Sequence, residues 1–246
     1  MADKEIEKNR YNESAKHALG DNNFFSVNNL TLPLKSPYDF YQSMIAKHAD
    51  SDNLILEIGA GMGENTDLLL TTGARVYATD VSETSLNVLD KRFQTSRLST
   101  KVADMEKLPF DDASFDMVVN AGSLSYGDNN IVLNEIYRVL KVKGVFIAID
   151  SLNHNPIYRL NRYIHYLRGH RSLSTLQRMP TLELLKRYQL KFGRIETKFF
   201  GSISYLVPLI NKLFGEQISA KISDKIDEVI LVKKSAFKFV MIVEKK

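Results

Sequence analysis

The sequence predicts an α/β fold built on a parallel, doubly wound sheet. Between residues 54 and 150, short apolar runs alternate with amphipathic stretches, a glycine-rich turn follows the first run, and acidic residues follow several of the others. Strand and helix alternating at this spacing are typical of right-handed βαβ units, whose strands pair in parallel.

The first half of the chain supplies the alternating elements. Residues 1–35 are polar and predict a short helix and a loop, and residues 38–48 predict a helix with Pro37 in its first turn. The alternating part then gives strands at 54–58, 75–79, 100–103, 115–120 and 144–150, and helices at 64–70, 83–93 and 131–140.

After Asp150 the rhythm changes. Residues 154–189 are predicted to be mainly helical and residues 192–200 to form a strand. Residues 202–214 predict an apolar helix interrupted by Pro208, and 236–244 alternate as a strand suited to a sheet edge.

Composition sets limits on the function. A chain of 246 residues predicts one large domain, or one domain with an appended cap. The absence of cysteine excludes disulfides, thiolate metal sites and a cysteine nucleophile. No run of 18 uncharged apolar residues predicts a membrane span, and the charged N-terminus lacks a secretory signal, so residence in the cytoplasm is expected. No metal site is predicted.

The net charge of +4 is unevenly divided. Residues 1–150 contain 15 basic and 22 acidic side chains (−7), whereas residues 151–246 contain 18 and 7 (+11). Such asymmetry indicates a basic surface that meets an anionic partner, or simply solvated lysines and arginines.

The first motif is the turn after the strand at 54–58. Gly59, Gly61 and Gly63 leave bare backbone N–H groups and a helix start where the anionic group of a ligand could lie. Glu64 stands where the dinucleotide fingerprint requires its third glycine, which argues against a nicotinamide or flavin site.

Two further motifs follow the neighbouring strands. Asp80 ends the strand that begins at Arg75, where a carboxylate can accept hydrogen bonds from both ribose hydroxyls of an adenosine. Asp104 and Met105 follow the next strand and could hold adenine, with the carboxylate on the exocyclic amine and the thioether against the ring.

These motifs occur in the order found in one enzyme family. They are Glu57-Ile-Gly59-Ala60-Gly61-Met-Gly63, Asp80, Asp104-Met105, the run Leu108 to Asp116 and the run Glu135 to Gly144. Together they resemble class I S-adenosylmethionine-dependent methyltransferases over residues 38–151, closest to the branch of ubiquinone and menaquinone biosynthesis enzymes.

The resemblance implies a Rossmann-like sheet of seven mostly parallel strands with an antiparallel last strand, plus a helical lid. Residues 1–36 are then a lead-in, 37–151 the cofactor-binding core, and 152–246 an arginine-rich lid with strands that complete the sheet. The cofactor residues that it implies are Glu57, Gly59, Ala60, Gly61 and Gly63 for the methionine part, Asp80 and Val81 for the ribose, Asp104 and Met105 for adenine, and Asn120 and Ala121 beside the methionine.

Methyl transfer is an in-line displacement at a sulfonium methyl, so the protein must align a nucleophile and, where needed, remove its proton. His154, just past the strand at 144–150, is a candidate base or, equally, a loop-capping histidine. Tyr126 is the second candidate catalytic residue and is expected to line the acceptor pocket; a packed loop tyrosine is the alternative. Tyr137 and Lys141 match the Tyr-x-x-x-Lys of short-chain dehydrogenases, but the glycine spacing does not, which favours ordinary helix residues.

No acidic residue lies between Asp150 and Glu183, where five arginines interleave with tyrosines. Arg159, Arg162 and Tyr163 are therefore predicted to bind an anionic acceptor, with a solvated helix face as the alternative. The full set of arginines is Arg159, Arg162, Arg168, Arg171 and Arg178.

The C-terminal runs at 198–210 and 236–240 resemble methyltransferases of bacterial surface-polysaccharide gene clusters, which implies a sugar hydroxyl on a nucleotide- or lipid-diphosphate carrier as acceptor. The apolar segment 205–214 could touch a membrane surface or be buried as a cap or dimer helix.

Three alternative functions stay open. They are a quinone-type or other small-molecule O- or C-methyltransferase, an RNA methyltransferase, for which no amino-methylation motif is present, and a non-catalytic cofactor-binding module. Nucleic acid is the less expected partner, and the oligomeric state is not predicted.

Overall fold

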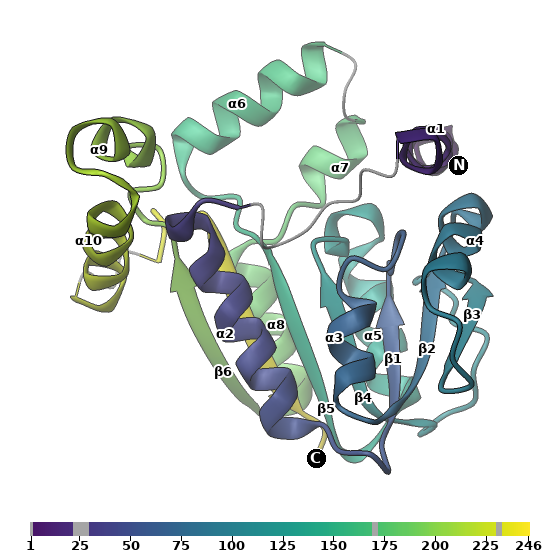
Figure 1. The fold of residues 1–246 in the computed structure, drawn as a ribbon. Helices are drawn as coiled ribbons and strands as arrows, with labels where there is room; N and C mark the ends of the chain where they lie inside the picture. The colour runs from purple at the N-terminus through teal and green to yellow at the C-terminus, as the bar shows by residue number, and fades with distance from the viewer. Residues whose placement is uncertain (1, 22–29, 169–171, 230–232) are drawn as a thin grey trace.

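The computed structural model describes residues 2–21, 30–168, 172–229 and 233–246. A seven-stranded sheet in the order β3-β2-β1-β4-β5-β7-β6 runs through the molecule (Figure 1). Its strands are β1 (Leu54–Ile58), β2 (Arg75–Asp80), β3 (Leu98–Val102), β4 (Phe115–Ala121), β5 (Leu140–Ser151), β6 (Arg194–Phe200) and β7 (Lys238–Glu244).

The first five strands pair in parallel, and β7 runs antiparallel to both β5 and β6. The Rossmann-like α/β fold with a seven-stranded sheet and an antiparallel last strand is therefore confirmed. The strand order reverses between β1 and β4, and ligands of open α/β sheets bind beside such a reversal, at the carboxyl ends of the strands.

Helices cover both faces of the sheet. On one face, Tyr41 and Ile45 of α2 (Leu32–His48) and Leu69 of α3 (Thr66–Thr71) share a buried cluster with strand residues. Leu86 and Leu89 of α4 (Glu83–Arg92) extend that layer. The opposite face carries α5 (Asn129–Val139) and α8 (Leu182–Phe192) (Figure 1).

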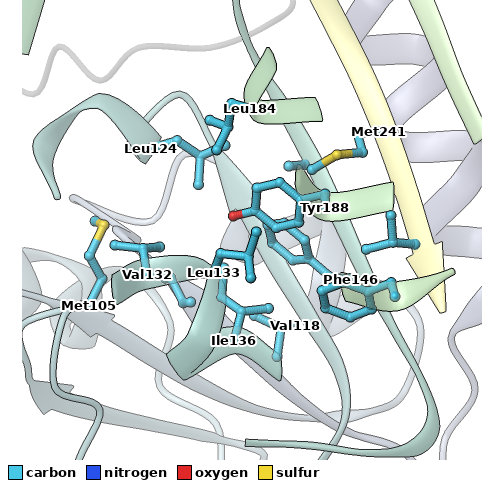
Figure 2. Close-up of a cluster of buried hydrophobic side chains, with 14 of the residues drawn as sticks. Met105, Val118, Leu124, Val132, Leu133, Ile136, Phe146, Leu184, Tyr188 and Met241 are labelled. Carbon is cyan, nitrogen blue, oxygen red and sulfur yellow. The ribbon is translucent and has the colours of Figure 1, made fainter. Parts of the chain in front are cut away.

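The largest buried cluster lies under α5 and α8. Figure 2 shows Phe146 of β5 beside Tyr188 of α8, and these two rings stack with their centroids 5.6 Å apart. The cluster extends to Met105 and Leu124, residues of the loops that follow β3 and β4 (Figure 2). The side chains of Met105 and Leu124 therefore anchor these two loops in the hydrophobic core.

The remaining helices lie at the end of the sheet where the parallel strands finish (Figure 1). They are α1 (Ala2–Asp21), the short 3-10 turn η2 (Leu124–Tyr126), α6 (Pro156–Leu167), α7 (Leu173–Gln177), α9 (Val207–Phe214) and α10 (Glu216–Val229). The division into a lead-in (1–36), a core (37–151) and a lid (152–246) stays a prediction.

Three sequence-based element predictions need correction. Helix α2 begins at Leu32 because Pro33 occupies its first turn, and Pro37 lies inside it. In the same way, Pro208 is a first-turn residue of α9 and does not interrupt a longer helix. Helix α10 had no counterpart among the expected elements.

None of the helices described is both long enough and apolar enough to cross a lipid bilayer.

Candidate active site

A cavity of about 920 Å³ opens at the carboxyl ends of β1, β2 and β4 and beside the loop after β3. Helix α1 lies over this edge of the sheet (Figure 1) and forms its cover. The residues that line the cavity are Glu5, Glu7, Lys8, Tyr11, Ser14, Tyr38, Ile58, Gly59, Ala60, Gly61, Met62, Glu64, Asn65, Asp80, Val81, Ser85, Val102, Ala103, Asp104, Met105, Ala121, Gly122, Ser123 and Tyr126.

The glycine turn after β1 forms the floor of the cavity. Gly59 has a φ of +68°, and a Cβ added there would overlap the hydroxyl of Ser123. Gly63, also predicted to bind cofactor, is buried outside the cavity lining, and a Cβ on it would come within 2.7 Å of the Phe93 ring. Gly59, Ala60 and Gly61 therefore face the cavity, whereas Gly63 allows the turn to pack against Leu89 of α4 and Phe93.

Asp80 connects the tip of β2 to the glycine turn. One carboxylate oxygen accepts a hydrogen bond from the Gly61 N–H at 3.0 Å, and the other accepts one from the Ser82 N–H at 2.9 Å. Burial raises the pKa of Asp80 above its ordinary value, although both backbone donors counteract that rise. Each oxygen keeps a second lone pair, so the carboxylate can also accept from a diol. Val81 lines the cavity beside it.

Asp104 and Met105 line the cavity on the β3 side. The loop that carries them is held from behind: Arg138 donates to the carbonyl oxygens of Leu108 and Phe110, at 3.0 and 2.7 Å. Glu135 in turn accepts the Leu108 N–H at 2.8 Å. The runs 108–116 and 135–144 thus support the loop after β3 and contribute no residue to the cavity lining.

Glu57 and Asn120 lie behind the cavity wall and are absent from its lining. The buried Glu57 carboxylate accepts a hydrogen bond from the Thr66 hydroxyl at 2.6 Å, and burial raises its pKa to about 8. Asn120 is fully buried and donates to the Ile58 carbonyl at 3.0 Å and to the Ser123 hydroxyl. Both side chains therefore support the turn and the Ser123 loop, while Ala121 beside them does line the cavity.

Helix α1 contributes residues that the sequence reasoning missed. The Tyr11 hydroxyl donates to the Tyr126 hydroxyl at 2.8 Å, and Arg10 donates to the same oxygen at 3.1 Å. Asn12 accepts a hydrogen bond from Ser82 at the start of α4, at 2.7 Å. Tyr126 lines the cavity, and these contacts attach α1 to the site at two points.

A second attachment joins α1 to α7. Glu7 is 7% exposed and accepts hydrogen bonds from the Ser172 N–H at 3.3 Å and the Thr175 hydroxyl at 3.0 Å. Arg10 forms an ion pair with Glu7 at 2.7 Å. No local motif reveals this role, because the apolar residues of α1 follow no helical period.

The charged side chains of the cavity lining are predominantly acidic. Glu64 joins Asp80 and Asp104, and burial raises the pKa of the Glu64 carboxyl. Glu5 and Glu7 add two carboxylates from α1, whereas Lys8 is the one basic side chain among the lining residues of the described ranges. Such a lining complements a cationic ligand.

The structure does not bring His154 to the cavity. Its Nε2 accepts a hydrogen bond from the Leu182 N–H at 2.9 Å, at the start of α8. Burial and the nearby Lys234 and Arg159 lower its pKa. The strand-end position placed His154 at the correct edge of the sheet, but its side chain caps a helix, which was the alternative prediction.

The predicted acceptor-binding set is also separated from the cavity. Arg162 is buried and donates to the Leu152 carbonyl at 3.1 Å, while Arg159 and Tyr163 are exposed on α6. None of the three lines the cavity, and Arg171 lies outside the described residues.

The dehydrogenase-like pair is structural. Tyr137 packs against Phe192 with ring centroids 5.1 Å apart, and Lys141 pairs with Asp116 at 2.8 Å. Neither residue lines the cavity.

Over the ranges that the structure describes, no three His, Asp or Glu side chains gather closely enough to hold a metal ion.

Comparison with known proteins identifies a methyltransferase domain and the same type of fold. Residues 56–148 match the family model described as a methyltransferase domain. The chain is 41% identical over 102 residues to a demethylmenaquinone methyltransferase of Clavibacter sepedonicus, covering 39% of this chain and 40% of that protein. It is 30% identical over 132 residues to a sterol 4-C-methyltransferase of Caenorhabditis elegans, covering 49% and 40%.

The match therefore spans about two fifths of the length of these curated relatives. Among solved structures, a putative sarcosine dimethylglycine methyltransferase from Galdieria sulphuraria superposes with a TM-score of 0.58 at 15% identity, covering 87% of each chain, a likeness that concerns the fold alone. The sheet order, the strand-end motifs and the family match together show that the chain carries a class I methyltransferase domain, whose cofactor is S-adenosylmethionine.

Proposed function

We propose that this chain transfers a methyl group from S-adenosylmethionine to a small acceptor with a quinone-type or other aromatic ring. One observation carries the proposal: Tyr11, Tyr38 and Tyr126 line the same cavity as the glycine turn and Asp80. A volume of about 920 Å³ is at the upper end of the range of small-molecule sites, which leaves room for an acceptor beside the cofactor.

The residues present fit the cofactor. Gly59, Ala60 and Gly61 line the cavity with small side chains or none, which permits close approach of a ligand to the backbone, and the acidic side chains of the lining suit a sulfonium and an ammonium group. In this proposal Asp80 and Val81 bind the ribose, Asp104 and Met105 flank the adenine, and the turn at 59–61 binds the methionine part. The cofactor, when bound, supplies an electrophilic methyl group.

The tyrosines position the acceptor and exclude water. Tyr126 is held by hydrogen bonds from Tyr11 and Arg10, so its ring has a defined orientation toward the cavity. Burial raises the pKa of Tyr11 well above its ordinary value, so Tyr11 stays protonated and acts as a donor rather than a base. A phenol or enol, which ionises more readily than an alcohol, suits a site of this kind.

Other acceptors receive less support from the site. A sugar hydroxyl is a weak acid and calls for a base, but His154 caps α8, and the arginines expected to bind a diphosphate lie outside the cavity. An RNA acceptor calls for basic side chains at the cavity, where the described lining has Lys8 against Glu5 and Glu7. The relatives named for menaquinone and sterol substrates also act on small molecules.

The test is methyl-labelled cofactor incubated with quinols and other phenols, sterols, nucleotide sugars, lipid-linked glycans and tRNA. Label is expected in the quinol or phenol fraction, with none for Asp80→Ala. Label in a sugar or tRNA fraction alone would refute the aromatic acceptor. No label in any fraction, with cofactor binding intact by calorimetry, would instead support a non-catalytic binding module.

A further inference from the structure

Helix α6 presents an apolar stripe to solvent. Ile157, Leu160, Ile164 and Leu167 recur at helical spacing on one face, and Leu160 and Leu167 are 61% and 66% exposed. The opposite face of the helix attaches it to the protein, through buried Arg162 and its hydrogen bond to the Leu152 carbonyl. The apolar stripe of α6 is therefore exposed to solvent on a helix that is itself anchored to the protein.

Helix α9 presents a second apolar face. Leu209 and Leu213 lie one turn apart along it and are 57% and 64% exposed, and Leu206, the residue just before the helix, continues the same spacing. Phe214 adds an aromatic ring that is 57% exposed. Isolated exposed apolar residues are ordinary, but two helices with whole faces of them mark an interaction surface.

The two helices lie near one another at the same end of the molecule (Figure 1). Tyr158, at the start of α6, shares a hydrogen bond with Ser204 and meets the Tyr205 ring edge-on at 6.4 Å, just before α9 begins. We call the exposed apolar residues of α6 and α9 the apolar end: Ile157, Leu160, Tyr163, Ile164, Leu167, Leu206, Leu209, Leu213 and Phe214.

Positive charge borders the apolar end. Arg159 lies one turn before Tyr163 and Arg168 one turn after Ile164, so exposed arginines flank both edges of the α6 stripe, and Lys212 is exposed on α9. Residues 151–182 contain no acidic side chain.

Three of the four acidic side chains of α10 accept hydrogen bonds within the protein. Asp224 accepts a hydrogen bond from Ser36 at 2.7 Å, and Asp227 accepts from the N–H groups of Gly201 and Ser202 at 2.6 and 2.9 Å. Glu216 accepts the Leu32 N–H at 2.6 Å. These three carboxylates are therefore occupied, whereas Glu228, in the last turn of α10, is exposed.

We propose that the apolar end is a docking surface for an anionic phospholipid bilayer, which the protein binds peripherally. An apolar helix face flanked by arginines matches the boundary between acyl chains and negatively charged headgroups. A second copy of the chain fits less well, because residues 151–182 would bring arginines against arginines with no carboxylate to pair them. The proposal is independent of the acceptor, since none of these residues lines the cavity.

The test is co-sedimentation of the full chain with vesicles of phosphatidylcholine alone and with about 30% phosphatidylglycerol, a fraction chosen to give a clearly anionic surface. Binding is expected only to the anionic vesicles and should weaken between about 0.1 and 0.5 M salt as charges are screened. The paired substitutions Leu160→Asp with Leu167→Asp, and Leu209→Asp with Leu213→Asp, should each lower binding about tenfold or more.

Leu190→Asp is the matched control. Leu190 is 76% exposed on α8, a helix that covers one face of the sheet and does not belong to the apolar end. This variant should therefore bind vesicles like the unchanged chain. Calorimetric cofactor binding verifies that each variant is folded. Equal sedimentation with both vesicle types, or paired variants that still bind, would overturn the proposal. A concentration-dependent dimer that the same pairs dissociate, without vesicle binding, would assign the surface to a second copy instead.

Discussion

The edge of the sheet formed by β1 to β4 and the helices that cover it place their residues in different ways. Gly59, Asp80 and Ala121 each stand at or directly after the end of a strand, so the parallel sheet alone brings them together. The cover depends on contacts between distant parts of the chain, such as Tyr11 with Tyr126 and Glu7 with Thr175.

This difference separates two kinds of effect. A substitution at the strand ends changes the shape or charge of the cofactor site itself, whose backbone cannot move without disturbing the sheet. A substitution in the cover removes one of several attachments and changes how firmly α1 closes. We therefore expect large losses of affinity at the strand ends and small kinetic changes in the cover.

The largest effect is expected for Gly59→Ala. The new Cβ would overlap the Ser123 hydroxyl, and the φ of +68° adds strain. We expect a loss of about 2–4 kcal/mol in unfolding free energy and of about 100-fold or more in cofactor affinity, measured by urea unfolding and calorimetry.

Gly215→Ala, between α9 and α10, is the matched control for backbone strain. Its φ is +81°, but nothing lies within 4 Å of the added Cβ, so only about 1 kcal/mol should be lost and affinity should be unchanged. Equal losses for the two variants would show that the Ser123 contact is unimportant.

Asp80→Ala comes next. Removal of a carboxylate proposed to accept from two ribose hydroxyls should weaken cofactor binding about 100-fold, since a hydrogen bond to a charged group contributes about 1.5–3 kcal/mol. Calorimetry measures the change, with Asp67→Ala, an exposed carboxylate on α3, as control. Unchanged affinity would remove the ribose assignment.

Glu57→Gln separates stability from binding. Between the ordinary pKa of 4.5 and about 8, the folded chain holds a proton on Glu57 that the unfolded chain has released, so the unfolding free energy falls as the pH rises. The amide has no such proton to lose. We expect the variant to melt at a higher temperature than the unchanged chain at pH 8 but not at pH 5, and to bind the cofactor about tenfold more weakly. A melting difference that is the same at both pH values would contradict the buried, protonated carboxyl.

The strand-end residues could be predicted from sequence because each motif is local. An apolar run followed by Gly59 or Asp80 places that residue at the carboxyl edge, whatever the rest of the chain does. The sequence did not distinguish Gly61, which faces the cavity, from Gly63, which packs against Phe93, because the alternation is the same for both.

The cover could not be predicted in this way. Tyr11 and Glu7 lie in a polar helix without an apolar period, and their partners are more than a hundred residues away. Arg162 shows the converse error: its residue type suggests an anion site, but tertiary packing buries its side chain, which donates to the Leu152 carbonyl.

Tyr11→Phe tests the cover with a smaller effect. The ring is kept, while the hydrogen bond to Tyr126, worth about 1 kcal/mol, is lost. The cofactor should dissociate about fivefold faster, measured by stopped-flow fluorescence with a cofactor analogue, with little change in the melting temperature. Tyr163→Phe on the exposed face of α6 is the control and should leave the rate unchanged. Equal rates for all three proteins would mean that α1 does not limit release.

The smallest effect is expected for His154→Gln. The Nε2 of His154 accepts the Leu182 N–H, and the amide oxygen of glutamine can accept the same bond, so about 1 kcal/mol or less of stability is lost and kcat is retained. Because burial lowers the histidine pKa in the folded chain, the unfolded chain takes up a proton first as the pH falls below 6.5. The unchanged chain therefore loses stability in that range, and the variant should lose less, as urea unfolding at pH 7.5 and 5.5 would measure. A large fall in kcat with unchanged cofactor affinity would instead restore His154 as the base and bring the covering region into the chemistry.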